Sequence, residues 1–267
     1  MKNFSDKVAV ITGAGSGIGR ALALQLAKNG CHLALADIDQ AGLDETRTLL
    51  GAGINVSLHQ VDVSSWEQMQ GFADEVEQQH GKLNLLINNA GVALGALFNE
   101  SSLEDMRWVM DINYWGVVYG CKAFGPLMKK TGDGYIVNIS SVFGLLTVPL
   151  QSAYCSSKFA VRGFSDVLRQ EAEYLGNNIR VACAFPAGIK TNIAKNARVT
   201  LHDSDLDLEE ERARMESWFW TTPEEAASDI LNGVRKGKIR IKVGKGSTII
   251  DLIARLMPVK YSMLVKI

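Results

Sequence analysis

The stretch Val8-Ala9-Val10-Ile11-Thr12-Gly13-Ala14-Gly15-Ser16-Gly17-Ile18-Gly19 decides the fold of this 267-residue chain. Its first four residues are apolar and predict a short buried strand, and the glycine-rich turn after them leads into a helical pattern over residues 20–29. Glycines let a phosphate approach the backbone, and the free amides at a helix N-terminus favour its negative charge. The alternative is a glycine turn that binds nothing, but its position between strand and helix favours a dinucleotide site.

The next apolar run, residues 33–36, predicts a second strand that ends at Asp37. A carboxylate at this point can accept hydrogen bonds from the hydroxyls of an adenosine ribose, and it repels a 2′-phosphate. Asp39 adds negative charge, and neither Ser16 nor Ile38 supplies the cation that NADP would need. We therefore expect NAD as the cofactor and regard NADP as disfavoured by Asp37.

Strand patterns and helical patterns alternate along the rest of the chain, which predicts an α/β fold with a doubly wound parallel sheet between two helical layers. No linker divides the chain, so residues 1–267 are expected to form a single domain. Thr222 and Pro223 are suited to begin a late helix, and the lysine-rich run over 236–243 predicts a last strand at a sheet edge. The other strand-like runs cover residues 55–61, 83–87, 135–139 and 179–184.

Tyr154 and Lys158 are four residues apart in a predicted helix, so their side chains lie on one face. An ammonium nearby favours the phenolate and lowers the pKa of the tyrosine, which makes it a candidate acid/base catalyst. Ser141 follows the strand over 135–139, where ligands bind in open α/β sheets, and its hydroxyl could hold a substrate oxygen. The alternative is an ordinary surface pair, because Tyr-x-x-x-Lys alone is common.

Asparagine side chains occur at two further positions where a ligand is expected. Asn88 and Asn89 follow the strand over 83–87, as a polar junction beneath a ligand or as a simple turn. Asn113 and Gly116 are poor residues for the interior of the helix expected over 102–130, so an interruption is predicted at 111–116. This interruption marks either a site or a kink.

Two late segments differ in composition from the rest. Residues from about 190 to 222 contain an acidic patch and then Trp218-Phe219-Trp220, and we interpret them as a substrate lid; the alternative places the aromatic residues in the core. The tail from about 246 to 267 is amphipathic and cationic, with Arg255, Lys260 and Lys266. It either packs on a neighbouring subunit or makes peripheral contact with a membrane.

Composition narrows the function classes. A net charge of -1 gives no indication of nucleic-acid binding, and no apolar run is long enough to span a bilayer. Cys31, Cys121, Cys155 and Cys183 are far apart, which favours reduced thiols in a cytoplasmic protein over disulfides or a metal site. The start of the chain lacks the apolar core of a signal peptide.

Taken together, these motifs resemble the short-chain dehydrogenase/reductase family in its compact single-domain form, over about residues 5–245. The resemblance implies a Rossmann-like three-layer αβα fold. It rests on Thr12-Gly13-x-x-x-Gly17-x-Gly19, Asp62, Asn88-Asn89-Ala90-Gly91, Asn113, Ser141, Tyr154-x-x-x-Lys158 and Pro186 to Thr191, all in the family's order. One departure is present, because the family usually has glycine directly after this proline and the chain has Ala187 and then Gly188.

The resemblance also implies roles. Tyr154 would exchange the substrate proton, Lys158 would lower its pKa and hold the nicotinamide ribose, Ser141 would bind the substrate oxygen, and Asn113 would steady a water-linked proton relay. Asp37 would bind the adenosine ribose, Asp62 and Val63 the adenine, and Ile189 and Thr191 the carboxamide. The implied cofactor contacts are Gly13, Ser16, Gly17, Ile18, Gly19, Asp37, Asp62, Val63, Asn89, Ala90, Gly91, Tyr154, Lys158, Pro186, Gly188, Ile189 and Thr191.

The predicted function is an NAD-dependent oxidoreductase that moves a hydride between nicotinamide and a secondary alcohol, ketone or aldehyde. Apolar residues in the lid and tail favour a lipophilic substrate, and the resemblance implies a homodimer or homotetramer built on the helices over 113–130 and 151–175. A sugar-nucleotide epimerase would need a larger C-terminal domain. A dinucleotide-binding sensor or scaffold without turnover would be expected to lack Ser141, Tyr154 or Lys158, and the chain keeps all three.

Overall fold

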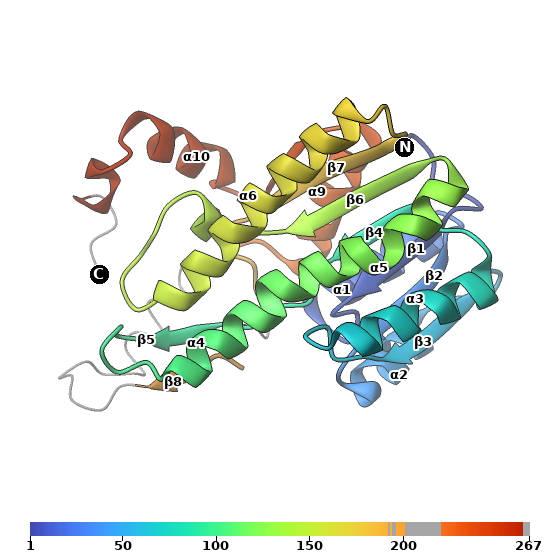
Figure 1. Ribbon diagram of the computed structural model, residues 1–267, viewed down its shortest axis with the longest axis horizontal. Helices are drawn as coiled ribbons and strands as arrows, with labels where there is room; N and C mark the ends of the chain where they lie inside the picture. Colours follow the sequence, from blue (N-terminus) through green and yellow to red (C-terminus); the bar gives the residue numbers. More distant parts are fainter. Residues whose placement is uncertain (192, 194–195, 201–219, 264–267) are drawn as a thin grey trace.

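The computed structural model describes residues 1–191, 193, 196–200 and 220–263, and its centre is a parallel sheet of seven strands. The strand order is β3-β2-β1-β4-β6-β7-β9, and helices cover both faces (Figure 1). The predicted doubly wound α/β fold is therefore confirmed. The strands are β1 (Val8–Thr12), β2 (His32–Asp37), β3 (Val56–Gln60), β4 (Leu85–Asn88), β6 (Gly134–Ile139), β7 (Ile179–Pro186) and β9 (Arg240–Val243).

Alternate residues of each strand enter two separate cores, because successive side chains point to opposite faces of a sheet. In β1, Ala9 and Ile11 pack with α1 and α9, whereas Val8 and Val10 pack with α3, α5 and α6. Both faces of the strand are fully buried, which explains its unbroken apolar sequence. The helices of these layers are α1 (Gly17–Lys28), α2 (Gln40–Leu49), α3 (Trp66–His80), α5 (Gly116–Thr131), α6 (Ser152–Tyr174) and α9 (Pro223–Arg235).

The order of the strands reverses between β1 and β4. From β1 the chain moves outward to β2 and β3, and it then returns to place β4 on the other side of β1, with Ile11 paired to both Leu35 and Ile87. The turns after β1 and β4 therefore leave the sheet side by side at its carboxyl edge. Such a reversal is where open α/β sheets bind their ligands.

The interruption predicted at 111–116 is a π-helical segment, Asp111–Trp115, between α4 (Leu103–Met110) and α5. The helix axis continues through it, so the defect is a widened turn and not a break. Asn113 lies in this turn and is completely buried. π-Turns inside helices are frequent at functional sites, and this one faces the carboxyl edge of β4.

The C-terminal elements begin as the sequence predicts. Thr222 caps α9 through a capping box with Glu225, Pro223 is the first helical residue, and β9 forms one edge of the sheet. After β9 follow α10 (Ser247–Leu256) and a 3₁₀ segment, η3 (Lys260–Met263). A small second sheet pairs β5 (Leu94–Ala96) with β8 (Arg198–Thr200).

Two predicted segments lie partly outside the described residues. Most of the lid, including its acidic patch, Trp218 and Phe219, falls there, as does the end of the tail at 264–267. Trp220, the first residue of the described range 220–263, is exposed. Within the described ranges, no helix is both long and apolar enough to cross a membrane.

Candidate active site

The glycine turn after β1 is packed so tightly that side chains would not fit. Gly13 has a φ of 65°, and a Cβ atom there would lie 2.9 Å from the Cα of Ala90. A Cβ atom on Gly19 would overlap the carbonyl oxygen of Gly13. Gly17 has a φ of 52°, and the methyl group of Thr191 lies 3.4 Å from the place of its absent Cβ. The turn therefore requires glycine for two reasons: a side chain would clash at Gly13 and Gly19, and the positive φ values of Gly13 and Gly17 favour glycine.

Asn89 joins this turn to the end of β4. Its side-chain nitrogen donates hydrogen bonds to the carbonyl oxygens of Thr12 at 2.9 Å and Gly13 at 3.1 Å. In return, the Thr12 hydroxyl accepts from the backbone amides of Asn89 at 3.0 Å and Ala90 at 3.1 Å. The side chain of Asn88 instead lies between the sheet and α5, where it donates to Asn138 at 2.8 Å and to the sulfur of Cys121 at 3.4 Å. Of the two alternatives for these amides, the polar junction agrees with the structure better than a simple turn.

The start of α1 presents backbone amides at this turn. Ser16 is the N-cap residue with an extended backbone, and among the described residues its side chain makes no capping hydrogen bond. Gly17, Ile18 and Gly19 follow, and Ile18 is buried in the core below. An anion placed at this helix end would meet free amides and the positive end of the dipole.

Arg20 stabilises the turn, a role that no local pattern in the sequence indicates. Its guanidinium donates to the carbonyl oxygen of Gly15, to the hydroxyl of Thr46 at 3.0 Å and to Glu45 at 2.7 Å. Thr46 in turn donates to the carbonyl oxygen of Ala14 at 2.9 Å. Glu45 and Thr46 belong to α2, so only the tertiary fold reveals the role of Arg20.

Asp37 lies at the end of β2, directly beside the turn. Its carboxylate accepts hydrogen bonds from the amide of Gly15 at 2.8 Å and from the amide of Asp39 at 3.1 Å. A Cβ atom on Gly15 would lie 2.9 Å from this carboxylate. The Asp37 carboxylate is therefore held beside the N-terminal end of α1.

Asp62 and Val63 follow β3 at the same edge. The Asp62 carboxylate accepts hydrogen bonds from the Ser64 amide at 2.9 Å and the Ser64 hydroxyl at 2.7 Å. The side chain of Val63 is buried, and Gly116 leaves space for it, because a Cβ atom there would lie 2.9 Å from Val63. The side chain of Val63 is therefore part of the core.

Tyr154 and Lys158 lie together on the first turns of α6, as predicted. The Nζ atom of Lys158 is 5.4 Å from the centre of the Tyr154 ring and donates to the carbonyl oxygen of Ile139 at 3.2 Å. The hydroxyl of Ser140 donates to the Lys158 carbonyl oxygen at 2.8 Å. These bonds fix the start of α6 against the end of β6, where Ser141 is located.

The expected lowering of the Tyr154 pKa is wrong for this structure. Burial raises the pKa of Tyr154 to about 12, although a hydrogen bond with Ser141 acts in the opposite direction. Burial also lowers the pKa of Lys158 to about 8. For both groups desolvation by burial is the largest cause of the shift, and it favours the neutral form of each. Near neutral pH the pair is therefore a neutral phenol beside an ammonium, which is the state of a proton donor.

Asn113 reaches the same place from the π-turn. Its carbonyl oxygen accepts from the Val92 amide at 2.8 Å, and its nitrogen donates to the Val92 carbonyl oxygen at 3.0 Å and to the Ser157 hydroxyl at 3.1 Å. A Cβ atom on Gly91 would lie 3.0 Å from Asn113 and 3.4 Å from the Lys158 Nζ. Asn113 therefore holds the backbone after β4 in place beside Lys158.

The residues after β7 complete the edge. The amide of Ala187 continues the strand pattern and donates to the Val243 carbonyl oxygen at 3.0 Å, while Gly188 takes a φ of 55°. The amide of Lys190 donates to the carbonyl oxygen of Thr221 at 2.9 Å, and the side chain of Ile189 is buried. Gly188, which stands one position later than the glycine of the family pattern, is thus the residue at which the backbone adopts a positive φ.

Other candidate sites are weaker. Burial raises the pKa of the Cys155 thiol, so its position next to Tyr154 does not make it reactive. Across the part of the chain that the structure describes, no group of three His, Cys, Asp or Glu residues could hold a metal.

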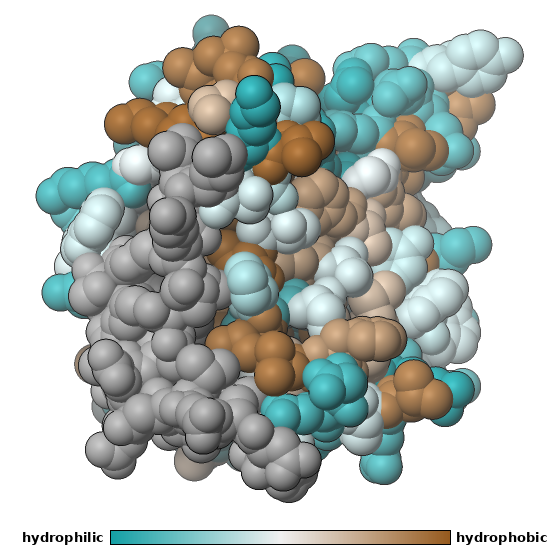
Figure 2. Space-filling model, turned by 90° about the vertical axis from the view of Figure 1, so that its left-hand side faces the viewer, coloured by the Kyte–Doolittle hydropathy of each residue, from teal (hydrophilic) through white to brown (hydrophobic). Residues whose placement is uncertain are grey.

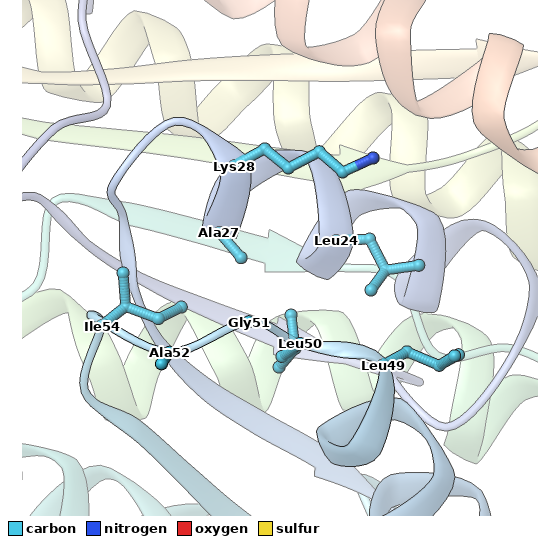
Figure 3. Close-up of a pocket in the computed structure, with 8 residues that line it drawn as sticks. All are labelled: Leu24, Ala27, Lys28, Leu49, Leu50, Gly51, Ala52 and Ile54. Atoms are coloured by element: carbon cyan, nitrogen blue, oxygen red, sulfur yellow. The ribbon is translucent and has the colours of Figure 1, made fainter.

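A surface pocket between α1 and the turn before β3 lies at the opposite, amino edge of the sheet (Figure 3). It is lined by Leu24, Ala27, Lys28, Leu49, Leu50, Gly51, Ala52 and Ile54.

A dinucleotide fits the residues of the carboxyl edge. The glycine turn supplies amides for a pyrophosphate, Asp37 supplies acceptors for ribose hydroxyls, and the close approach at Gly91 keeps the space beside Lys158 free of side chains. Tyr154 and Ser141 lie at the same edge, where a substrate oxygen would meet them. The arrangement is suited to proton exchange next to a nicotinamide.

Comparison with known proteins agrees with this geometry. Residues 7–201 match the family model described as short chain dehydrogenase. The chain is 45% identical over 266 residues to "Putative oxidoreductase SadH" of Mycobacterium tuberculosis, covering 99% of this chain and 96% of that protein. It is 32% identical to estradiol 17-beta-dehydrogenase 11 of Mus musculus, over 99% of this chain and 84% of that protein.

A similar structure has been solved for a short chain dehydrogenase/reductase from Burkholderia phymatum in complex with NAD. The two folds superpose with a TM-score of 0.88 at 32% sequence identity, covering 99% of this chain and 97% of the other. A short chain dehydrogenase from Mycobacterium paratuberculosis bound to NAD gives a TM-score of 0.78 at 26% identity, covering 92% of this chain and 99% of the other.

Proposed function

The chain belongs to the short-chain dehydrogenase family of oxidoreductases, and from this we propose that it transfers a hydride between NAD and a secondary alcohol, ketone or aldehyde. The proposal rests on one observation. The side chains of Tyr154, Lys158 and Ser141 lie together, at the same edge of the sheet as the glycine turn. The three side chains come from α6 and the end of β6, and only the fold brings them to the dinucleotide-binding edge.

The preference for NAD over NADP rests on Asp37. Its carboxylate is held in place by the amides of Gly15 and Asp39, so it cannot easily turn away from an incoming 2′-phosphate. Two related structures contain NAD, which supports the same choice. Gly13, Ser16, Gly17, Gly19, Asn89 and Ala90 would surround the pyrophosphate, and Asp62 and Val63 the adenine.

The nicotinamide, when bound, supplies or accepts the hydride. The chain's own residues handle the proton and the substrate oxygen. Ser141 holds this oxygen, and Tyr154, neutral at physiological pH, donates its proton to it during reduction. The Lys158 ammonium stabilises the phenolate that remains, because opposite charges a few ångström apart attract strongly in a buried site. In oxidation the same groups act in reverse.

We propose that Asn113 acts through the backbone of Val92, and that Pro186, Gly188, Ile189 and Thr191 border the nicotinamide side of the site. A lipophilic substrate is supported by the name of the mouse relative, estradiol 17-beta-dehydrogenase 11. The lid remains a prediction, because most of it lies outside the described residues.

Self-association through α5 and α6 also remains a proposal. Exposed apolar side chains support it, namely Trp115 before α5 and Phe159 and Val167 on α6. A dinucleotide sensor without turnover is less well supported, because the acid/base pair and Ser141 are assembled together. An epimerase is less well supported, because residues 7–201 match the family model of short chain dehydrogenases.

Kinetic assays with both nicotinamide cofactors test the proposal. The purified protein would be given a panel of aliphatic, alicyclic and steroid alcohols and ketones, each with NAD(H) and with NADP(H), and nicotinamide absorbance would be followed. We expect turnover of at least one lipophilic substrate, with a higher kcat/KM for NAD. If NADH binds but no member of the panel turns over, the sensor alternative is favoured, and if NADP is preferred, the role of Asp37 is wrong.

A further inference from the structure

The outer face of α10 carries a row of exposed apolar side chains. Ile249, Leu252 and Leu256 are 64%, 55% and 72% exposed, and their spacing places them on one face of the helix. Val259, just beyond the helix, is 78% exposed and extends the row. In Figure 1, α10 lies at the upper left, beside the layers of helices and sheet. Figure 2 views the molecule from that side and shows apolar side chains clustered near the top. We call these four residues the α10 face.

The charged residues of the segment that carries the α10 face are almost all positive. Lys245, Arg255 and Lys260 are exposed near it, and the only acidic residue within 242–263 is Asp251. Asp251 is buried and bound to Lys242 at 2.7 Å and to Arg255 at 3.1 Å. This segment is therefore cationic, in a chain whose net charge is -1.

The inner side of the helix is fixed to the body of the protein. The hydroxyl of Ser247 donates to the Phe185 carbonyl oxygen at 2.9 Å, and Asp251 is bound to Lys242 of β9. The Tyr261 hydroxyl accepts a hydrogen bond from the Thr147 amide at 3.0 Å and lies 2.7 Å from the Thr147 hydroxyl. The apolar row consequently cannot turn inward to bury itself, and it stays on the surface.

We propose that the α10 face docks on the surface of a lipid bilayer that contains anionic phospholipids. Apolar residues on one side of such a helix enter the boundary between headgroups and acyl chains, while flanking Lys and Arg residues bind lipid phosphates. A second copy of the chain fits this face less well, because a symmetric contact would bring the cations of both copies together. Thr147 lies between Ser141 and Tyr154 in the chain, so docking would place the bilayer next to the substrate side of the site.

Vesicle cosedimentation tests the proposal without reference to catalysis. The full-length protein would be mixed with vesicles of phosphatidylcholine alone or of phosphatidylcholine and phosphatidylglycerol in equal parts. We expect binding to the anionic vesicles and weaker binding to the neutral ones. Replacing both Lys245 and Lys260 by Gln should lower anionic binding by about fivefold per charge and reduce its dependence on salt.

Substitutions in the apolar row separate insertion from simple charge attraction. Leu252→Glu and Leu256→Glu should each reduce binding at least about tenfold, because a carboxylate opposes both insertion and the anionic surface. Leu49→Glu is the matched control, since Leu49 is similarly exposed, at 54%, and lies on α2 away from the α10 face. Circular dichroism would show that each variant is folded.

Two results would overturn the proposal. One is wild-type protein that remains in the supernatant with both kinds of vesicle. The other is a change in molar mass by light scattering for Leu252→Glu, with vesicle binding equal to that of the wild type, which would make the α10 face an interface between copies.

Discussion

The ammonium of Lys158 lies 5.4 Å from the centre of the Tyr154 ring, and burial moves the pKa values of the two groups in opposite directions. The pKa of the lysine falls to about 8 and that of the tyrosine rises to about 12. Lys158 is therefore the member of the pair that titrates first as the pH rises. In the proposed mechanism, its protonation would decide whether the phenolate formed in reduction has a positive neighbour.

This order of titration predicts the pH dependence of ketone reduction. Since Lys158 loses its proton above about pH 8, kcat/KM should fall as the pH rises through that value. In Lys158→Arg the cation persists, so activity should be lower but the fall near pH 8 should disappear. Steady-state rates on both sides of pH 8 provide the measurement. A fall near pH 8 that persists unchanged in the arginine variant would show that another group is responsible.

Cofactor choice should change when the charge of Asp37 is removed. Asp37→Asn keeps an acceptor for the Gly15 amide but abolishes the repulsion of a 2′-phosphate. The ratio of kcat/KM for NADP over NAD should rise about tenfold to hundredfold. Asp44→Asn, an exposed change on α2, should leave the ratio unaltered. A ratio that does not move in Asp37→Asn would contradict the role given to this carboxylate.

Two glycine substitutions should have opposite effects. In Gly19→Ala the new methyl group overlaps the Gly13 carbonyl oxygen, so NADH binding should be lost and the protein destabilised. In Gly71→Ala, within α3, the methyl group meets open space, and the helix should gain about 0.5–1 kcal/mol. Fluorescence titration with NADH and thermal unfolding measure both. If NADH affinity and thermal stability changed equally in the two variants, the tight packing of the glycine turn would not be required for cofactor binding.

Acid should destabilise the protein through a histidine pair at the edge of the sheet. Burial lowers the pKa values of His59 and His80 below the ordinary 6.5, and both side chains hydrogen bond to Ser57, at 2.8 and 2.9 Å. Below pH 6.5 the unfolded chain takes up protons that the folded one resists, so the free energy of unfolding should fall.

The variant His80→Gln removes one titrating group from this pair and keeps a hydrogen-bonding side chain. It should lose less stability between neutral pH and about pH 5 than the wild type, by up to about 1.4 kcal/mol per pH unit. Urea unfolding at the two pH values gives the comparison. An identical loss in variant and wild type would exclude His80 as a contributor.

Local patterns were enough to predict most of the fold. The strand and turn over Val8–Gly19, the cap at Thr222 and the defect at Asn113 all depend on neighbours within a few residues, and the structure has each of them. Asn113 also shows the limit of such patterns. The sequence indicated a weak point in the helix, but the hydrogen bonds to Val92 that define its role join separate parts of the chain.

What the sequence did not predict depends on tertiary burial. The pKa of Tyr154 was expected to fall because the sequence shows the cation four residues away, while the desolvation that raises the pKa comes from the packed site. Arg20 was missed for a related reason, since Glu45 and Thr46 reach it from α2. The position of Gly188 with its φ of 55° likewise became clear only from the backbone.

The central claim is that Tyr154 passes the proton, and Tyr154→Phe tests it most directly. The change removes one hydroxyl and keeps the ring beside Lys158. With a substrate found in the panel, turnover should fall about a hundredfold to ten-thousandfold, while the Kd for NADH stays close to that of the wild type. Turnover at the wild-type rate in Tyr154→Phe, with NADH binding intact, would contradict the account.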